Sequence, residues 1–226
     1  MSKPLDQNPS AVLDFQREKR IGLSEAVFCA RKSPGQIANI LARFEEHATS
    51  CLLTRLDQKK FNALPSPLQK QLDYDSLSST AFFLDPNPKP HKIRVAIVSG
   101  GTSDASVCAE AARTLAFYGV TSNSFQDVGV TGLWRLLERL EEIQDYPIVI
   151  TVAGMEGAIF SVLGGLIDAI IIAVPTSVSY GIGSDGELAL HAALGSCAPG
   201  LVTVNIDNGY GAACSALRII NKLRIV

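Results

Sequence analysis

The sequence predicts an α/β protein built on a doubly wound parallel sheet, with a smaller α/β element ahead of it. Three observations lead to this prediction. Short apolar runs recur through the second half of the chain, segments of helical length and period separate these runs, and a proline-rich stretch precedes them. Strands that are apolar at nearly every position are typical of a parallel sheet covered by helices on both faces.

The proline-rich stretch, DPNPKPH at residues 85–91, predicts a linker. Proline and the residue before it are both biased away from helix, so a regular element is not expected there. We therefore expect a small N-terminal α/β domain at residues 1–84 and a larger domain at residues 92–226.

In the small domain, Ser33 and Pro34 form a good helix start, with the serine as N-cap and the proline at the first helical position. Candidate strands lie on either side of this helix, at residues 25–29 and 51–54. The first 20 residues are expected to be loosely ordered.

In the larger domain, apolar runs and the helical segments between them alternate regularly. The expected strands are residues 93–98, 147–152, 169–174 and 201–206, with a weaker strand at 121–128. The expected helices are residues 105–118, 131–143, 154–166, 186–194 and 209–223. Ligands bind such sheets beyond the carboxyl ends of the strands, so the strand-to-helix turns are where a site is expected.

The composition excludes several classes of function. The formal net charge is -2 and the basic residues are scattered, so we expect no nucleic-acid partner. The first twenty residues carry charges throughout, and the longest apolar run, at residues 169–175, is too short to span a bilayer, so we expect no membrane association. The five cysteines lack CxxC spacing and nearby histidines, which favours a reducing cytoplasm over a zinc site or disulfides.

The turn after the first of these strands is rich in small residues: Ser99, Gly100, Thr102, Ser103 and Asp104. Backbone N–H groups and hydroxyls in such a turn can converge on an anion. The turn is neither a GxGxxG fingerprint nor a Walker loop, and it can equally be a tight turn with Ser103 or Asp104 as a helix cap.

Two further turns carry polar groups at the same edge. Glu156, next to Gly154 in AGMEG, is either a charge that stabilises a helix N-terminus or a general base. The long segment that contains Thr176, Ser177 and Tyr180 suits a lid over a small-molecule site, or else is a plain mobile connector.

The last two motifs contain a cysteine and two polar residues. Cys197, in SCAPG, is either a nucleophile or a small buried apolar residue. Asp207 and Asn208, at the end of the last strand, can cap the final helix or bind a ligand. The remaining cysteines are expected to be packing residues: Cys29, Cys51, Cys108 and Cys214.

Taken in order and spacing, VSGGTSD, AGMEG, GGLIDAIIIAVPTSVSYG, SCAPG and VNIDNGYGA resemble the LarB family, over residues 93–222. The family's C-terminal domain is similar to PurE, the carboxylases and mutases that act on aminoimidazole ribonucleotide (AIR). The resemblance implies a flavodoxin-like, PurE-like three-layer sandwich. It also implies a step of nickel-pincer cofactor synthesis, in which nicotinic acid adenine dinucleotide and CO2 give pyridinium-3,5-biscarboxylic acid mononucleotide and AMP.

The resemblance implies roles for residues within these motifs. Cys197 would be the thiolate that adds to the electron-poor pyridinium ring, and Glu156 the base that removes the ring proton. Ser103 and Asp104 would hold the ribose phosphate or the CO2 region, and Asp207 would line the site.

The resemblance also bears on cofactors and partners. Arg135 is a candidate anion clamp, although it can equally lie on an ordinary helix face. Mg²⁺ is the expected ion for phosphoanhydride cleavage, with CO2 or bicarbonate as co-substrate and no bound prosthetic group; no dedicated metal cage is visible in the sequence. The related purine carboxylases form octamers, so a homo-octamer is expected here.

Three departures from the family pattern stand out: Phe160 in place of a common proline, Ser179 in place of a usual glycine, and the ending Ala-Ala-Cys at residues 212–214. They keep open a catalytically impaired, nucleotide-binding regulatory protein, like the cyanobacterial relatives labelled circadian phase modifiers. An AIR carboxylase or mutase is disfavoured, because AGMEGAIFSV lacks the histidine that those enzymes use.

Overall fold

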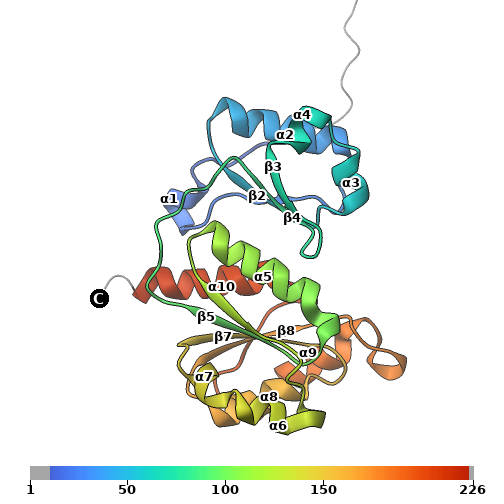
Figure 1. The fold of residues 1–226 in the computed structure, drawn as a ribbon, viewed down its shortest axis with the longest axis vertical. Coiled ribbons are helices and arrows are strands. Elements are labelled where there is room, and N and C mark those ends of the chain that lie inside the picture. Colours follow the sequence, from blue (N-terminus) through green and yellow to red (C-terminus); the bar gives the residue numbers. More distant parts are fainter. Residues whose placement is uncertain (1–10, 224–226) are drawn as a thin grey trace, which may run out of the picture.

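The chain folds around two β-sheets, one in each half. The computed structural model describes residues 11–223, and Figure 1 shows a small unit (residues 11–84) stacked on a large unit (residues 95–223). The connecting residues 85–94 form neither helix nor strand. The expectation of loose order over the first 20 residues lies partly outside the described residues; within them, a short helix α1 (Arg17–Ile21) is formed.

The sheet of the large unit has five strands, all parallel, in the order β6-β5-β7-β8-β9. Their bounds are β5 (Val95–Ser99), β6 (Ser122–Phe125), β7 (Ile148–Ala153), β8 (Ile170–Pro175) and β9 (Val202–Thr203). Every residue of the central strands β5 and β7 is buried, which is why their sequences are almost uniformly apolar. This sheet confirms the predicted doubly wound fold class.

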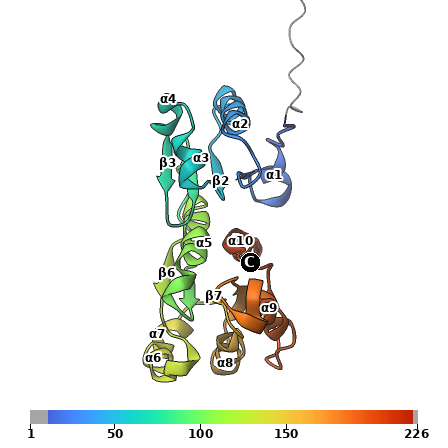
Figure 2. The same ribbon diagram turned by 90° about the vertical axis from the view of Figure 1, so that its right-hand side faces the viewer.

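Helices cover both faces of this sheet and make three layers (Figure 2). One face carries α5 (Ala105–Phe117) and α10 (Gly209–Leu223), which also lie between the sheet and the small unit. The other face carries α6 (Leu133–Glu138), α7 (Leu140–Gln144), α8 (Ala158–Leu166) and α9 (Glu187–Leu194). Two apolar cores, one on each face, hold the layers together.

Four predicted elements of the large unit had the wrong bounds, one of them the strand expected over residues 121–128, which is β6 (Ser122–Phe125). The helix expected from residue 154 begins at Ala158, because Met155 and Gly157 both have positive φ, 52° and 61°. The helix expected over residues 131–143 is broken at Arg139 into α6 and α7. The strand expected over residues 201–206 pairs over two residues only, Val202 and Thr203.

The small unit contains a four-stranded sheet with the order β1-β2-β4-β3, in which β1 and β2 are parallel and the other pairs antiparallel. Its strands are β1 (Val27–Phe28), β2 (Cys51–Thr54), β3 (Leu72–Asp75) and β4 (Thr80–Phe83). Its helices after α1 are α2 (Pro34–Glu46), α3 (Gln58–Asn62) and α4 (Ser66–Gln69). The predicted helix after Ser33 and the strand at 51–54 are confirmed, whereas the hairpin of β3 and β4 was not predicted.

The two units are joined by contacts onto α5 besides the linker. The Arg113 guanidinium lies 3.8 Å from the ring centroid of Phe82 in β4, and it donates to the Asp73 carboxylate at 2.9 Å. The Phe82 ring also packs edge-on against Phe117, at the end of α5. A cation over an aromatic face contributes about 1 kcal/mol. The small unit is therefore held directly on the helix that follows β5.

No helix within residues 11–223 is long and apolar enough to cross a lipid bilayer.

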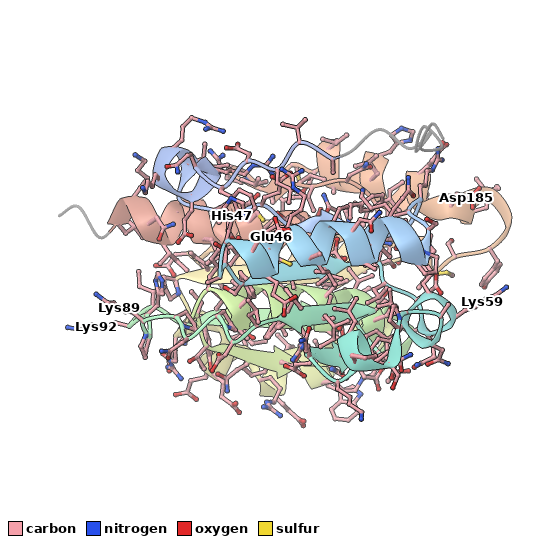
Figure 3. All side chains as sticks on the ribbon, turned by 90° about the horizontal axis from the view of Figure 1, so that it is seen from above. Glu46, His47, Lys59, Lys89, Lys92 and Asp185 are labelled. Atoms are coloured by element: carbon pink, nitrogen blue, oxygen red, sulfur yellow. The ribbon has the colours of Figure 1, made fainter. Side chains whose placement is uncertain are left out.

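The ends of the parallel sheet can be located in Figure 3 from labelled charged residues. Lys89 and Lys92, which precede β5, lie at one end of the molecule, and Asp185, which follows β8, lies at the other. The strands therefore end on the side of Asp185.

Removing the cap of α2 should destabilise the small unit. The Ser33 hydroxyl accepts the Gln36 N–H at 3.2 Å, and the Gln36 side chain accepts the Ser33 N–H at 2.9 Å, which makes a full capping box. We expect Ser33→Ala to lower the free energy of unfolding by about 1 kcal/mol in urea titrations. Ser33→Asp keeps an acceptor and should stay close to the wild type; equal stability of all three proteins would contradict this role.

Candidate functional site

A hollow of about 280 Å³ lies at the carboxyl end of β5, where the order of the strands reverses. β6 pairs with one side of β5, and β7 pairs with the other side. Its walls are the turns after β5, β6 and β7, together with Val178. Parallel sheets bind ligands at this kind of switch point, because the two turns diverge there and leave a crevice at the carboxyl edge. We therefore take this hollow as the candidate active site.

The turn after β5 supplies one wall. Gly100, Ser103 and Asp104 line the hollow, and Ser103 is exposed to it. Thr102 is also exposed but does not line the hollow, and Ser99 lies fully buried beneath it. The turn is a short 3-10 helix (Thr102–Asp104) in which no Ser103 cap forms; instead Asp104 reaches back to accept the Gly101 N–H at 3.2 Å.

Asp104 is a buried carboxylate at the floor of the hollow, with 3% of its surface exposed. Its second oxygen accepts the Thr176 hydroxyl at 2.7 Å. Burial raises the pKa of the Asp104 carboxyl, the two hydrogen bonds oppose this rise, and the nearby charge of Asp207 adds to it. A carboxyl whose pKa is raised by burial inside a hollow is a candidate for proton transfer.

The turn after β7 supplies the opposite wall and carries Glu156, which is exposed and lines the hollow. Gly154 precedes it at a position where a side chain cannot fit, since a Cβ there would lie 2.0 Å from the Val178 carbonyl oxygen. The Met155 N–H donates to that same oxygen at 3.0 Å. The Glu156 turn is thus bound directly to the long loop that follows β8.

That loop begins with Thr176, which is fully buried, and continues through Ser177 and Val178 on the surface. Its farther part projects from the molecule after β8 (Figure 1), and Tyr180 is 78% exposed. Tyr180 does not line the hollow. Serine at position 179 causes no backbone strain, because its φ is not positive; the left-handed positions of this loop are Gly181, Asp185 and Gly186.

Asp207 and Asn208 lie after β9, beside the same loop. Asp207 accepts the Ser177 N–H at 2.9 Å, and Asn208 accepts the Gly211 N–H at 2.8 Å, which caps the start of α10. Asp207 does not line the main hollow but lines a smaller one of about 110 Å³, which it shares with Arg55 and Glu110. Asn208 thus serves as the cap that was one of its two predicted roles.

Cys197 is exposed, but a single chain does not bring it to the hollow. The residues on either side of Cys197 contact α8. The Ser196 hydroxyl forms a hydrogen bond with the Ser161 hydroxyl at 2.7 Å, and the Ala198 methyl packs on Gly164. Because α8 runs away from the Glu156 turn, this contact lies further along the helix. Of the five cysteines, all within the described residues, Cys29, Cys51 and Cys108 are buried and Cys214 is half-buried.

Arg135 also lies outside the hollow. It is on α6, and its guanidinium pairs with the Asp127 carboxylate in the loop after β6. The sequence did not indicate the wall formed by Gly129, Val130 and Thr131 in that loop, although their position after a parallel strand could have done so. It also did not indicate Arg55, which lies beside Asp207 only because the small unit packs against the large unit.

The fold and this hollow define an α/β protein with a candidate ligand site at the switch point of a parallel sheet. The family described as AIR carboxylase matches residues 94–224, and the one described as LarB/PurE-like N-terminal domain matches residues 5–84. An uncharacterized protein of Methanocaldococcus jannaschii is 35% identical over 213 residues, covering 90% of this chain and 81% of that protein. The chain therefore belongs to the LarB-like family, with a PurE-like AIR carboxylase domain.

Replacing the buried carboxylate of Asp104 should stabilise the protein near neutral pH. An asparagine can accept the Gly101 N–H and donate to the Thr176 hydroxyl, because a hydroxyl both donates and accepts. The raised pKa means that the native state binds this proton more tightly than the unfolded state, so ionisation costs stability as pH rises through the shifted pKa.

We therefore expect Asp104→Asn to have a higher melting temperature than the wild type near neutral pH. The gain should shrink as pH falls to about 4, the ordinary range for aspartate. Asp168→Asn, which removes the same charge from an exposed position, is the control and should show no such trend. A lower melting temperature of Asp104→Asn near neutral pH would contradict the argument.

Proposed function

We propose that this protein carboxylates and cleaves nicotinic acid adenine dinucleotide, giving pyridinium-3,5-biscarboxylic acid mononucleotide and AMP. The observation that carries the proposal is that Glu156 and the buried Asp104 line the same hollow, in a chain that matches both the LarB/PurE-like N-terminal domain and the AIR carboxylase domain. Burial raises the pKa of the Asp104 carboxyl, and a carboxyl with a raised pKa suits proton transfer.

The chemistry needs a nucleophile, a base and an anion site. The thiolate of Cys197 adds to a carbon of the pyridinium ring, and the resulting enamine uses the neighbouring carbon to attack CO2. Glu156 then takes the proton from the newly carboxylated carbon, and the thiolate leaves with restoration of the aromatic ring. Water cleaves the phosphoanhydride separately and releases AMP. The small residues of the Gly100 turn are suited to a phosphate.

We propose that Cys197 reaches this hollow from a second copy of the chain, because the residues on either side of it, Ser196 and Ala198, contact α8 of its own chain. Large apolar side chains near it are exposed, including Leu194 at 68% and Val202 at 44%. Exposed apolar groups of this size on one side of a protein favour association. We therefore propose a homo-oligomer, and an octamer by analogy with the related purine carboxylases.

A metal ion has a limited place in this proposal. The described residues contain no group of three or more His, Cys, Asp or Glu side chains that could hold one, and both Asp104 oxygens already accept hydrogen bonds. This donor set does not fit a Mg²⁺ ion held by the protein. Mg²⁺ bound chiefly by substrate phosphates, as is common for this cation, remains our proposal for the cleavage step.

The departures from the family pattern leave the hollow intact. Phe160 is fully buried, and its ring lies under Gly157, where a Cβ would approach it to 2.5 Å. The ring therefore fills the core beneath the Glu156 turn and does not enter the hollow. We propose that the enzyme works in the cytoplasm, where an exposed thiol such as Cys197 stays reduced.

The reaction can be tested directly. We expect the purified protein with nicotinic acid adenine dinucleotide, bicarbonate and Mg²⁺ to release AMP and a mononucleotide heavier by one carboxylate, detected by mass spectrometry. Glu156→Gln should lower kcat by about a hundredfold or more, and Cys197→Ser should abolish carboxylation. Cys214→Ser, within α10, is the matched control and should keep turnover.

Other outcomes of that assay would overturn the proposal. Saturable binding of the dinucleotide without product would indicate a regulatory nucleotide-binding protein. Turnover of aminoimidazole ribonucleotide in place of the dinucleotide would indicate a purine carboxylase. Full activity of Cys197→Ser would exclude the thiolate adduct.

Mixing two inactive variants tests the origin of the thiol. If Glu156 and Cys197 of one site come from different copies, co-assembly of Glu156→Gln and Cys197→Ser chains in equal amounts creates some complete sites. Random association should restore about a quarter of the wild-type activity. No recovery in a mixed oligomer of confirmed composition would contradict a shared site.

A further inference from the structure

Arg55, at the end of β2 in the small unit, connects that unit to the candidate site. Its Nε lies 3.2 Å from a Glu110 carboxylate oxygen on α5, and its Nη2 donates to the backbone carbonyl of Asp207. Glu110 has only 5% of its side chain exposed, whereas Arg55 has 39% exposed. One guanidinium thus neutralises a buried carboxylate and holds a carbonyl of the large unit at the same time.

Glu110 is itself part of the support for this region. Its other oxygen accepts the Tyr210 N–H at 3.1 Å, in the first turn of α10. Gly209 begins that helix against α5, where a Cβ would lie 2.4 Å from the Val107 carbonyl oxygen. The start of α10 is therefore closely packed, and the residues just before it, including Asp207, have little freedom to shift.

Asp207 has a φ of 54°, a left-handed conformation that is unfavourable for residues other than glycine. Such a residue keeps this conformation only when its surroundings hold it. Its N–H donates to the Pro175 carbonyl at 2.8 Å, and its carboxylate accepts the Ser177 N–H. These two partners flank Thr176, whose hydroxyl donates to Asp104.

We propose that Arg55 is a positioning residue, which holds Asp207 and thereby the first residues of the loop 176–186 in the arrangement that the site requires. It acts through its hydrogen bond to the Asp207 carbonyl. An arginine suits this task because its planar fork can bind Glu110 and a carbonyl together, which a lysine ammonium cannot do in the same geometry. The small unit would then take part in forming the site, in addition to packing on α5.

A merely structural role for Arg55 would be to fasten the two units together. Arg113 serves that purpose from α5, the helix that also carries Glu110. It binds Asp73 and covers Phe82 without touching Asp207 or the loop. Arg113→Ala is therefore a matched control. It removes an arginine between the same two units and leaves the proposed connection in place.

Hydrogen exchange of the full-length protein, followed by mass spectrometry, provides a test that needs no substrate. We expect Arg55→Ala and Arg55→Lys to raise amide exchange in the segment 176–186 by about tenfold, the effect of losing one hydrogen bond to a charged group. Arg113→Ala should leave that segment unchanged. Since Arg55→Lys keeps a positive charge beside Glu110, it serves if the alanine variant fails to fold.

Unchanged exchange in the segment 176–186 of Arg55→Lys would overturn the proposal, and so would an equal increase in Arg113→Ala. A second measurement, which rests on the proposed function, is the Kd for nicotinic acid adenine dinucleotide by calorimetry. We expect Arg55→Lys to weaken binding by about tenfold, and Arg113→Ala to change it little. If the wild type does not bind the dinucleotide, the proposed substrate is wrong, while the exchange result still decides the role of Arg55.

Discussion

The chain leaves β5 toward β6 and returns on the other side in β7, and this reversal places the candidate hollow. Because all five strands are parallel, the turns that follow them meet at one edge, and the turns after β5 and β7 diverge there. The strands beneath this edge are buried along their whole length, and the turn of Asp104 and the turn of Glu156 line one hollow above them.

The same edge shows how a buried charge is supported. Asp104 lies in surroundings that disfavour its ionised form, and the hydroxyl and N–H groups around it reduce that penalty without removing it. Active sites commonly keep such locally unfavourable groups, because a group at its most stable would transfer protons poorly. The close fit of Gly154 under Val178 indicates that the loop beside Asp104 is held to the Glu156 turn as one assembly.

The fold class followed from the sequence because strands buried on both faces, such as β5 and β7, are apolar at each position. The turns that follow those strands were also predictable, since the edge they share is a property of the topology. The helix start at Ala158 was not, because the left-handed conformation of Met155 leaves no periodic signal. The positions of Cys197 and Arg55 depend on tertiary packing, with α8 and with Glu110, which no local pattern encodes.

The shortness of β9 has a consequence for how copies of the chain can meet. A strand that pairs over two residues presents few backbone groups at the sheet edge, so another chain gains little by extending the sheet there. Aggregation through edge-to-edge pairing is thereby discouraged on this side. In the homo-oligomer that we propose, recognition between copies would therefore rely on side chains of the neighbouring helices, which single substitutions can alter.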